Sequence, residues 1–259
     1  YNMANSERLV KLKDYLIQHN GTSIKELSEA LAVTEMTVRR DLKLLSDRGD
    51  VIINHGVVVY RPHFISIESR AYSVENQKSF MLDQKIRIGK AASELITPDD
   101  VIFMDVGTTV ECVANAIQQN SPITAMCFAA NTFLSLQKKN IGQIIMSGGY
   151  YHPSTQAFES EALAPVLKGL RASKAFIAPS AASMEVGLTC STQYDMQIKK
   201  LVISNSIQHI VVLTSDKFGK VKSTGFADWS QIHTVITDSG ISPQWIEFIK
   251  SKSIELIIV

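Results

Sequence analysis

One predicted helix places residues with nucleic-acid-binding chemistry on a single side. Positions 34 to 49, TEMTVRRDLKLLSDRG, predict a helix that Thr34 caps and Gly49 ends. On a wheel of about 100° per residue, the apolar side that would pack inward consists of Val38, Leu42 and Leu45. The opposite side, with Thr37 at its margin, consists of Met36, Arg39, Arg40 and Lys43. The helix therefore concentrates positive charge where a ligand would meet it.

This basic side has the chemistry to contact DNA. A major groove admits an α-helix, in which arginine pairs bidentately with guanine and threonine or methionine touches bases or methyl groups. Arg40 and Lys43 equally suit phosphate contacts, which position a protein without reading sequence. Glu35 and Asp41 are expected at the flanks of the basic side. Because an isolated basic helix is more often a solvated surface, the neighbouring elements must decide between the two interpretations.

The elements around this helix predict a helix-turn-helix with a wing. Residues from Ser6 onward predict a first helix, and Ser23 and Glu26 have the spacing of a capping box that starts a second. Two β-rich runs, 51–54 and 57–60, follow the third helix and predict a hairpin. Two short helices joined by a tight turn are typical of the helix-turn-helix. This arrangement favours DNA binding over a solvated surface.

Polar and glycine residues follow several apolar runs in the second half of the chain. Asp105 follows VIFM and precedes Gly107, Thr108 and Thr109, at the start of a predicted helix whose N–H groups suit a phosphate. Asp105 itself suits a sugar hydroxyl, although such a turn equally serves to cap a helix. Further positions offer the same choice between a ligand contact and an ordinary turn or surface residue: Asn131, Gly148, Gly149 and Lys217.

Seven short apolar runs alternate with helical stretches between residue 84 and the end: VIFMDVG, ITAMCFA, QIIMSGG, KAFIAPS, HIVVLTS, HTVITD and IELIIV. This alternation predicts an α/β fold with a mostly parallel sheet buried between helices. Ligands of such folds bind beyond the carboxyl ends of the strands, where the polar residues above lie. We therefore predict a small winged helix-turn-helix domain at 1–62, a linker at 63–83 and a larger α/β domain at 84–259.

Composition narrows the classes of function. The 259 residues include 26 Lys and Arg and 25 Asp and Glu, a net charge of +1, which excludes a broadly basic nucleic-acid coat protein. Three cysteines without CxxC spacing, no signal peptide and no apolar run of roughly 18 residues favour a cytoplasmic protein with no membrane contact. The six histidines have no metal-ligand spacing. We therefore expect neither a metal nor a cofactor.

Two sets of segments resemble the DeoR family of bacterial transcriptional regulators. The stretch SIKELSEALAVTEMTVRRDLKLLSDRGDVIINHGVVVY is similar to that family's winged helix-turn-helix, and TVRRDL, from Thr37 to Leu42, is its most specific piece. In this order, DVGTT, SGGYY, SDKFGK and VITD resemble the effector domain, which is related in fold to ribose-5-phosphate isomerase and glucosamine-6-phosphate deaminase. The chain departs from the family pattern in its wing, which lacks a Gly-Gly pair, and at Ala178-Pro179-Ser180-Ala181, where many relatives have Gly-Val-Asp-Gly.

The resemblance implies a repressor of a carbohydrate or nucleoside catabolic operon. Together with the helical wheel, it implies that operator double-stranded DNA contacts Thr34, Met36, Thr37, Arg39, Arg40 and Lys43. A phosphorylated sugar effector would lie near Asp105, Gly107, Thr108, Thr109, Asn131, Gly148, Gly149 and Lys217. The segments CFAANTFLSL and SGGYYHPSTQAF make deoxyribose 5-phosphate the candidate effector. Since paired heads read spaced half-sites, a homodimer or higher homo-oligomer is expected.

An enzyme is the alternative hypothesis, namely a sugar-phosphate isomerase or deaminase with an added DNA-binding head. Such an enzyme needs a general base positioned near the substrate carbon. Four carboxylates are available, and their spacing singles out none of them: Asp105, Glu185, Asp195 and Asp238. The sequence therefore favours a regulator without catalytic activity, but it does not separate a repressor from an activator.

Overall fold

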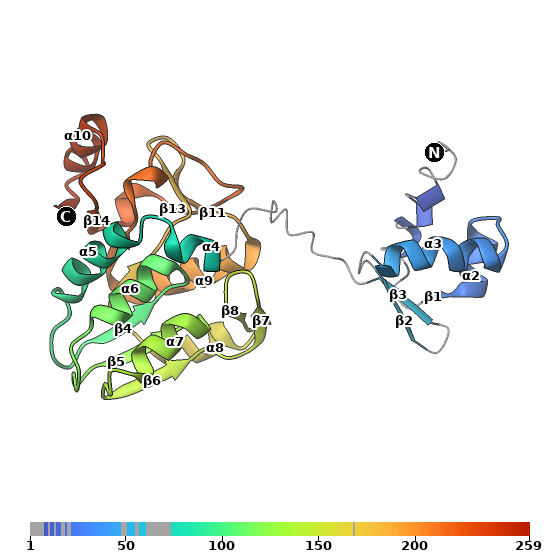
Figure 1. The fold of residues 1–259 in the computed structure, drawn as a ribbon, viewed down its shortest axis with the longest axis horizontal. Coiled ribbons are helices and arrows are strands. Elements are labelled where there is room, and N and C mark those ends of the chain that lie inside the picture. The colour runs from blue at the N-terminus through green and yellow to red at the C-terminus, as the bar shows by residue number, and fades with distance from the viewer. Residues whose placement is uncertain are drawn as a thin grey trace. The chain divides into compact units, whose positions relative to one another are not determined.

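The chain forms two compact units, Tyr1–Ser69 and Arg70–Val259 (Figure 1). The computed structural model describes residues 8–9, 11–12, 14–16, 19, 22–47, 51–54, 57–60, 74–167 and 169–259. Ser6, the predicted start of the first helix, and Gly49, the predicted end of the third, lie outside the described residues.

The first unit has the predicted order of helices and strands. Residues 8–9, 11–12 and 14–16 are helical, and α2 (Ile24–Ala30) and α3 (Glu35–Asp47) follow. The capping box at the start of α2 is confirmed, since Ser23 and Glu26 exchange side-chain and backbone hydrogen bonds. Strands β2 (Val51–Asn54) and β3 (Val57–Tyr60) pair antiparallel, as the two β-rich runs predict. A two-residue strand, β1 (Thr22–Ser23), adds to β3 and was too short to predict.

A small apolar core holds α3 in place. Val38, Leu42 and Leu45 are at most 1% exposed and pack with Leu12 and Leu16 of the first helix. The same core includes Leu27 of α2 and the wing residues Val51 and Val58. The prediction that this side of α3 faces inward is confirmed, so the opposite side of the helix is left for solvent or a ligand.

The second unit is built on a seven-stranded sheet, and all seven strands are parallel. Its order is β15-β14-β12-β9-β4-β5-β6. The strands are the seven predicted runs: β4 (Val101–Met104), β5 (Thr124–Cys127), β6 (Gln143–Met146), β9 (Ala172–Ile177), β12 (Ser206–Val212), β14 (Thr234–Thr237) and β15 (Glu255–Ile258). Since both faces are buried, the central strands read as nearly continuous apolar runs.

Helices cover both faces of this sheet (Figure 1). Ile102 and Met104 of β4 pack in a core with α5 (Leu82–Ser93), α6 (Thr108–Ala116) and α7 (Ala130–Gln137). Phe103, between them, points to the other face, where the core includes α8 (Leu163–Leu167), α9 (Gln193–Ser204) and α10 (Pro243–Ser251). The unit is therefore a three-layer α/β domain.

Short elements extend the domain beyond the predicted ones. Strands β7 (Tyr150–His152) and β8 (Ala157–Glu159) form a hairpin, and β10 (Ala181–Ser183), β11 (Gly187–Cys190) and β13 (Thr224–Ala227) form a small antiparallel sheet. Two 3₁₀ turns, η1 (Ser215–Lys217) and η2 (Trp229–Gln231), follow β12 and β13. None of the described helices is both long and apolar enough to span a membrane.

The predicted linker at 63–83 requires a correction at its carboxyl end. Residues Val74–Ser79 form helix α4, and α5 begins at Leu82. Val74 is buried, and its N–H donates to the carbonyl of Ser154 at 2.9 Å, so this part of the chain belongs to the second unit. A helix of fewer than two turns is too short to show helical periodicity, which is why it resembled a linker.

Candidate functional sites

The basic side of α3 is exposed in the first unit. Met36 is 80% exposed, and Arg39, Arg40 and Lys43 are also exposed. Thr34 precedes the helix, where its hydroxyl accepts a hydrogen bond from the Thr37 N–H at 3.3 Å. The structure thus places five of the six predicted DNA-binding residues on α3, whose opposite side packs in the core, and the sixth, Thr34, directly before it. A large apolar side chain such as Met36, held out in solvent beside cations, suits a surface that reads thymine methyl groups and phosphates.

The two acidic residues of α3 have different environments. Glu35 is exposed and lies 3.8 Å from the Arg39 guanidinium, a distance and exposure at which an ion pair contributes little. Asp41, expected at the flank of the basic side, is buried, and both its oxygens accept hydrogen bonds from Arg8, at 2.6 and 2.9 Å. Its charge is therefore neutralised by the first helix and does not oppose the basic side.

In the second unit, the strand order reverses between β4 and β9. From β4 the chain proceeds to β5 and β6 on one side, while β9, β12, β14 and β15 lie on the other. Open α/β sheets bind ligands at such a switch point, beyond the carboxyl ends of the strands. Gly107, with φ 153°, precedes α6 there, and a Cβ at this position would come within 2.9 Å of the Ala178 Cβ, which follows β9. Predicted residues Asp105, Thr108 and Thr109 are all buried at this point.

Asp105 is part of a buried ion-pair cluster. Lys199 of α9, fully buried, places its Nζ 2.5 Å from Asp105 Oδ2 and 3.0 Å from Asp195 Oδ1. The Ala178 N–H also donates to Oδ2, at 3.0 Å. Burial raises the pKa of Asp105 to about 6, against the opposing charge of Lys199. Burial acts to lower the pKa of Lys199, but the charges of Asp105 and Asp195 outweigh it and raise that pKa above its ordinary value.

The two oxygens of Asp105 differ in their hydrogen bonding. Among the described residues, Oδ1 has no hydrogen-bond partner although it is buried. An unsatisfied buried acceptor costs roughly 1–3 kcal/mol, which a hydroxyl of a ligand would recover. Asp105 is therefore firmly held through Oδ2 and still offers an acceptor through Oδ1.

Asn131 lies in the first turn of helix α7 rather than in a loop turn. It is 3% exposed, and its Nδ2 donates to Glu111 Oε2 of α6 at 2.7 Å. In the part of the chain that the structure describes, its Oδ1 has no partner, and neither does the buried hydroxyl of Thr132. Asn131 thus offers a ligand an acceptor through Oδ1, while one N–H of its Nδ2 is engaged by Glu111.

Lys217 lies in η1, after β12. Its Nζ is 3.1 Å from Asp216 Oδ2 and 5.8 Å from the centre of the Phe80 ring. Lys85, buried in α5, has its pKa lowered by burial and by the charge of Lys217, and Glu111 acts on it in the opposite direction. Lys85 therefore lies within electrostatic range of both η1 and α6. In the described parts of the chain, no group of three or more His, Cys, Asp or Glu side chains is placed to hold a metal ion.

Comparison with protein families assigns both units. Residues 8–62 match the DeoR-like helix-turn-helix domain, and residues 81–239 match the DeoR C terminal sensor domain. The chain belongs to the DeoR family. Its DNA-binding head is therefore the first unit, and its sensor domain is the second.

Full-length relatives in this family are named as regulators. The deoxyribose operon repressor of Escherichia coli (strain K12) is 29% identical over 251 residues, 97% of each chain. The lactose phosphotransferase system repressor of Lactococcus lactis subsp. lactis is 30% identical over 247 residues, 95% of each chain. Among solved structures, ribose 5-phosphate isomerase A of Methanocaldococcus jannaschii aligns at 13% identity over 53% of this chain and 54% of that one, with a TM-score of 0.40. That likeness is too low to support any argument about activity.

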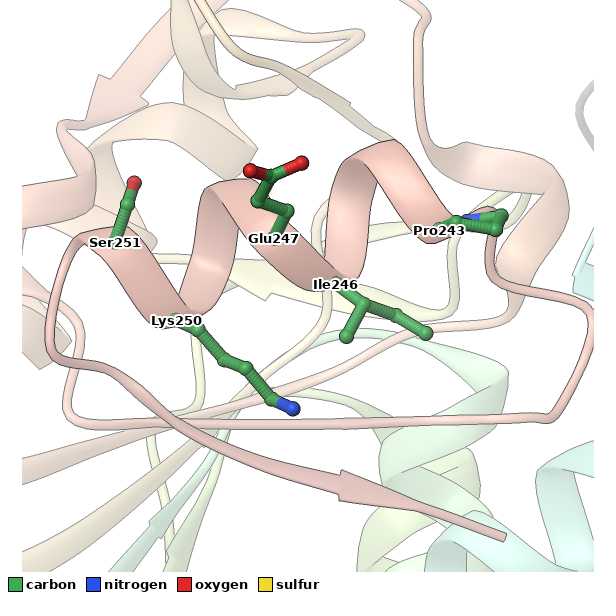
Figure 2. A pocket seen from close by; sticks show the side chains of 5 residues that line it. All are labelled: Pro243, Ile246, Glu247, Lys250 and Ser251. Atoms are coloured by element: carbon green, nitrogen blue, oxygen red, sulfur yellow. The ribbon is translucent and has the colours of Figure 1, made fainter.

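A surface depression on the DeoR sensor domain lies away from the predicted effector-binding residues. It runs along α10 and is lined by Pro243, Ile246, Glu247, Lys250 and Ser251 (Figure 2). Figure 2 shows Ile246 and Lys250 on one side of the helix and Glu247 and Ser251 on the other. None of the predicted effector-binding residues lines it.

Sequence reasoning missed Lys199 and Glu111, two residues that hold the predicted site together. Lys199 follows Asp195 by four positions and precedes Ile203 by four, so the helical wheel alone places it on the buried side of α9. A lysine on an apolar side requires a buried carboxylate as partner, and that was the available signal. Glu111 is one turn after Gly107 in α6, but its partners lie on α4 and α7 and leave no sequence signal.

The two glycines after β6 have different roles. Gly149 has φ 113°, and a Cβ there would lie 2.1 Å from the Glu159 carbonyl oxygen, so close packing against β8 requires glycine. Gly148 has φ 63°, but no described atom lies within 4 Å of an added Cβ. Of the two, only Gly148 has open space in which a ligand can approach the backbone.

We expect Gly149→Ala to destabilise the sensor domain by roughly 2–5 kcal/mol, from backbone strain and the clash with Glu159. Gly148→Ala is the matched control and should cost only about 1–2 kcal/mol, because strain acts there without a clash. Urea unfolding followed by tryptophan fluorescence measures this domain selectively, since both tryptophans, Trp229 and Trp245, lie in it. Equal losses in the two variants would contradict the packing role of Gly149.

Proposed function

We propose that the chain is a repressor that binds operator DNA through α3 and is controlled by a phosphorylated sugar bound at the switch point of the sensor domain. The observation that carries the proposal is that one chain combines an exposed basic recognition helix with buried, unpartnered acceptors at that switch point, on Asp105 and Asn131 among the described residues. Acceptors of this kind suit the hydroxyls of a sugar, and the start of α6 suits its phosphate.

Deoxyribose 5-phosphate is the effector we propose. A relative that aligns over 97% of its length is named a deoxyribose operon repressor, which supports this choice together with the CFAANTFLSL and SGGYYHPSTQAF segments. We further propose a homodimer or higher homo-oligomer, because two heads are needed to read two half-sites. Its target, operator DNA, would place the regulator in the cytoplasm.

The four carboxylates considered as enzymatic bases are all engaged in structural contacts. Asp105 and Asp195 pair with Lys199, Glu185 accepts from Ser183 at 2.7 Å, and Asp238 accepts from the Ser215 N–H and hydroxyl, both at 2.7 Å. A general base must reach the substrate proton. The hydrogen bonds of Glu185 and Asp238 and the ion pair of Asp195 favour a sensor over an isomerase, whereas Asp105 keeps one unpartnered oxygen, Oδ1. Steady conversion of an aldose phosphate to a ketose by the purified protein would overturn the regulator-only interpretation.

A gel-shift titration tests the regulator. The DNA is the region upstream of the protein's own gene, at one stated salt concentration, because phosphate contacts make affinity steeply salt-dependent. We expect specific binding that weakens in the presence of deoxyribose 5-phosphate and less so with ribose 5-phosphate or glucose 6-phosphate. Such an effect requires unequal affinity of the effector for two conformations. Binding no tighter than to unrelated DNA would refute the proposal.

A further inference from the structure

Helix α4 packs beside the predicted effector site. It is the first described element of the second unit in chain order, and it contacts α6, whose first turn carries Thr108 and Thr109 (Figure 1). The Val74 N–H attaches its beginning to Ser154, in the connection between β7 and β8. The chain between the head and the sensor domain therefore leads directly into an element that touches the site.

A chain of three side chains joins α4 to Asn131. Lys78 Nζ of α4 lies 2.9 Å from Glu111 Oε1, and Glu111 Oε2 accepts from Asn131 Nδ2 at 2.7 Å. The Glu111 side chain is only 16% exposed, whereas that of Lys78 is 39% exposed. Each oxygen of one carboxylate thus serves a different helix, and Asn131 is fixed with its unpartnered Oδ1 directed away from Glu111.

A second set of contacts joins α4 to α5 and the residue directly after α4 to η1. Lys85 of α5 donates to the Gln77 carbonyl of α4, and the Phe80 ring lies under the Lys217 ammonium. Lys217 is one of the residues predicted to lie near the effector. The first set therefore connects α4 itself, and the second connects Phe80, the residue directly after α4, to a residue that the effector would bind.

We propose that Glu111 is a positioning residue of the effector site and that Lys78 couples occupation of this site to α4 and so to the chain that leads to the head. The inference rests on the proposed function. Glu111 orients Asn131 toward a ligand hydroxyl. A ligand that draws Asn131 and Lys217 toward itself alters two contacts, the ion pair of Glu111 with Lys78 of α4 and the contact of Lys217 with Phe80. Allostery requires a structural element, here α4, that has two arrangements whose equilibrium is shifted both by the effector site and by the DNA-binding head.

Two variants separate positioning from coupling. Lys78→Met leaves the Glu111–Asn131 hydrogen bond intact, whereas Glu111→Gln disturbs both contacts of that carboxylate. The matched control is Lys174→Met, which removes an ion pair with Asp100, 2.5 Å long, that does not involve the predicted site. Each full-length variant is titrated with deoxyribose 5-phosphate in a thermal-shift assay and with operator DNA, with and without this sugar phosphate.

We define the coupling factor as the ratio of operator affinities without and with the effector. In Lys78→Met we expect this coupling factor to decrease at least fivefold, while effector affinity stays within about threefold of the parent. In Glu111→Gln effector affinity falls at least tenfold. In Lys174→Met the effect of the effector on operator binding and the effector affinity should both equal those of the parent. A coupling factor in Lys78→Met within twofold of the parent, or the same loss in Lys174→Met, overturns the coupling role. Unchanged effector affinity in Glu111→Gln overturns the positioning role.

Amide hydrogen exchange without ligand tests the anchoring of α4 separately. Exchange in α4 should accelerate at least threefold in Lys78→Met and stay at the parent rate in Lys174→Met. If α4 exchanges at the parent rate in Lys78→Met, the ion pair does not hold this helix and the inference is wrong. A parent protein that binds no sugar phosphate refutes the proposed function instead, and the exchange result still decides the role of Lys78.

Discussion

Replacing Lys199 with methionine should destabilise the sensor domain by about 3–5 kcal/mol. Methionine keeps the length and apolar contacts of the side chain but leaves Asp105 and Asp195 without their shared cation, 2.5 and 3.0 Å away. A buried carboxylate without a partner is costly, whereas a well-paired one costs little. For a domain of this size the melting temperature should fall by roughly 6–20 °C.

The loss in Lys199→Met should also depend on pH. Without the lysine, burial raises the pKa of Asp105 in the folded protein further above the value of about 6 that it has beside Lys199. An acid whose pKa is higher in the folded state binds more protons there than in the unfolded state, so its contribution to stability falls as pH rises. The difference in stability between the variant and the parent should therefore be larger at pH 8 than at pH 5.5.

Neighbouring substitutions make this prediction specific. Lys200→Met changes the next residue, an exposed lysine, and should leave stability within about 0.5 kcal/mol of the parent. Adding Asp105→Asn to Lys199→Met removes one unpaired charge and should recover part of the loss, as a coupled pair does in a double-mutant cycle. Urea unfolding measured through Trp229 and Trp245 checks all three proteins. A Lys199→Met protein as stable as Lys200→Met would show that the cluster contributes nothing.

Sequence patterns predicted the framework of this protein because the framework depends on local periodicity. The seven strands of the main sheet follow from apolar runs that a sheet buried on both faces requires. Val38, Leu42 and Leu45 follow from helical spacing, and the hairpin strands follow from two β-rich runs. Elements too short for a period were not predictable, including β1 and α4.

The predicted site was recognised less completely because its contacts span long distances in the sequence. Asp105 was predicted as a ligand contact, but Lys199, which holds it, is 94 positions away. Asn131 was identified at the end of an apolar run, while its orientation depends on Glu111, 20 positions earlier. Residue types at strand ends therefore indicate where a ligand binds, whereas the polarity that each residue offers is set by partners that only the fold brings together.

Arg39→Ala and Arg40→Ala should each weaken operator binding by roughly 5- to 150-fold, because a well-placed arginine contact with a base contributes about 1–3 kcal/mol. Neither change should disturb the head, since both side chains are exposed and the ion pair of Arg39 with Glu35 is long and solvated. Arg87→Ala is the matched control, since Arg87 is exposed on α5 of the sensor domain and its loss changes net charge equally.

The pattern of that loss shows what each arginine contacts. If Arg40 reads a base, the loss should be largest for one base pair of the operator and vanish when that pair is changed. If it contacts a phosphate, the loss should be uniform across sequences, and the slope of log affinity against log salt should fall by about 1. In both cases the rise in melting temperature produced by the effector should match the parent, because the sensor domain is unaltered. Parental operator affinity in both variants at matched salt would exclude this side of α3 as the DNA-reading surface.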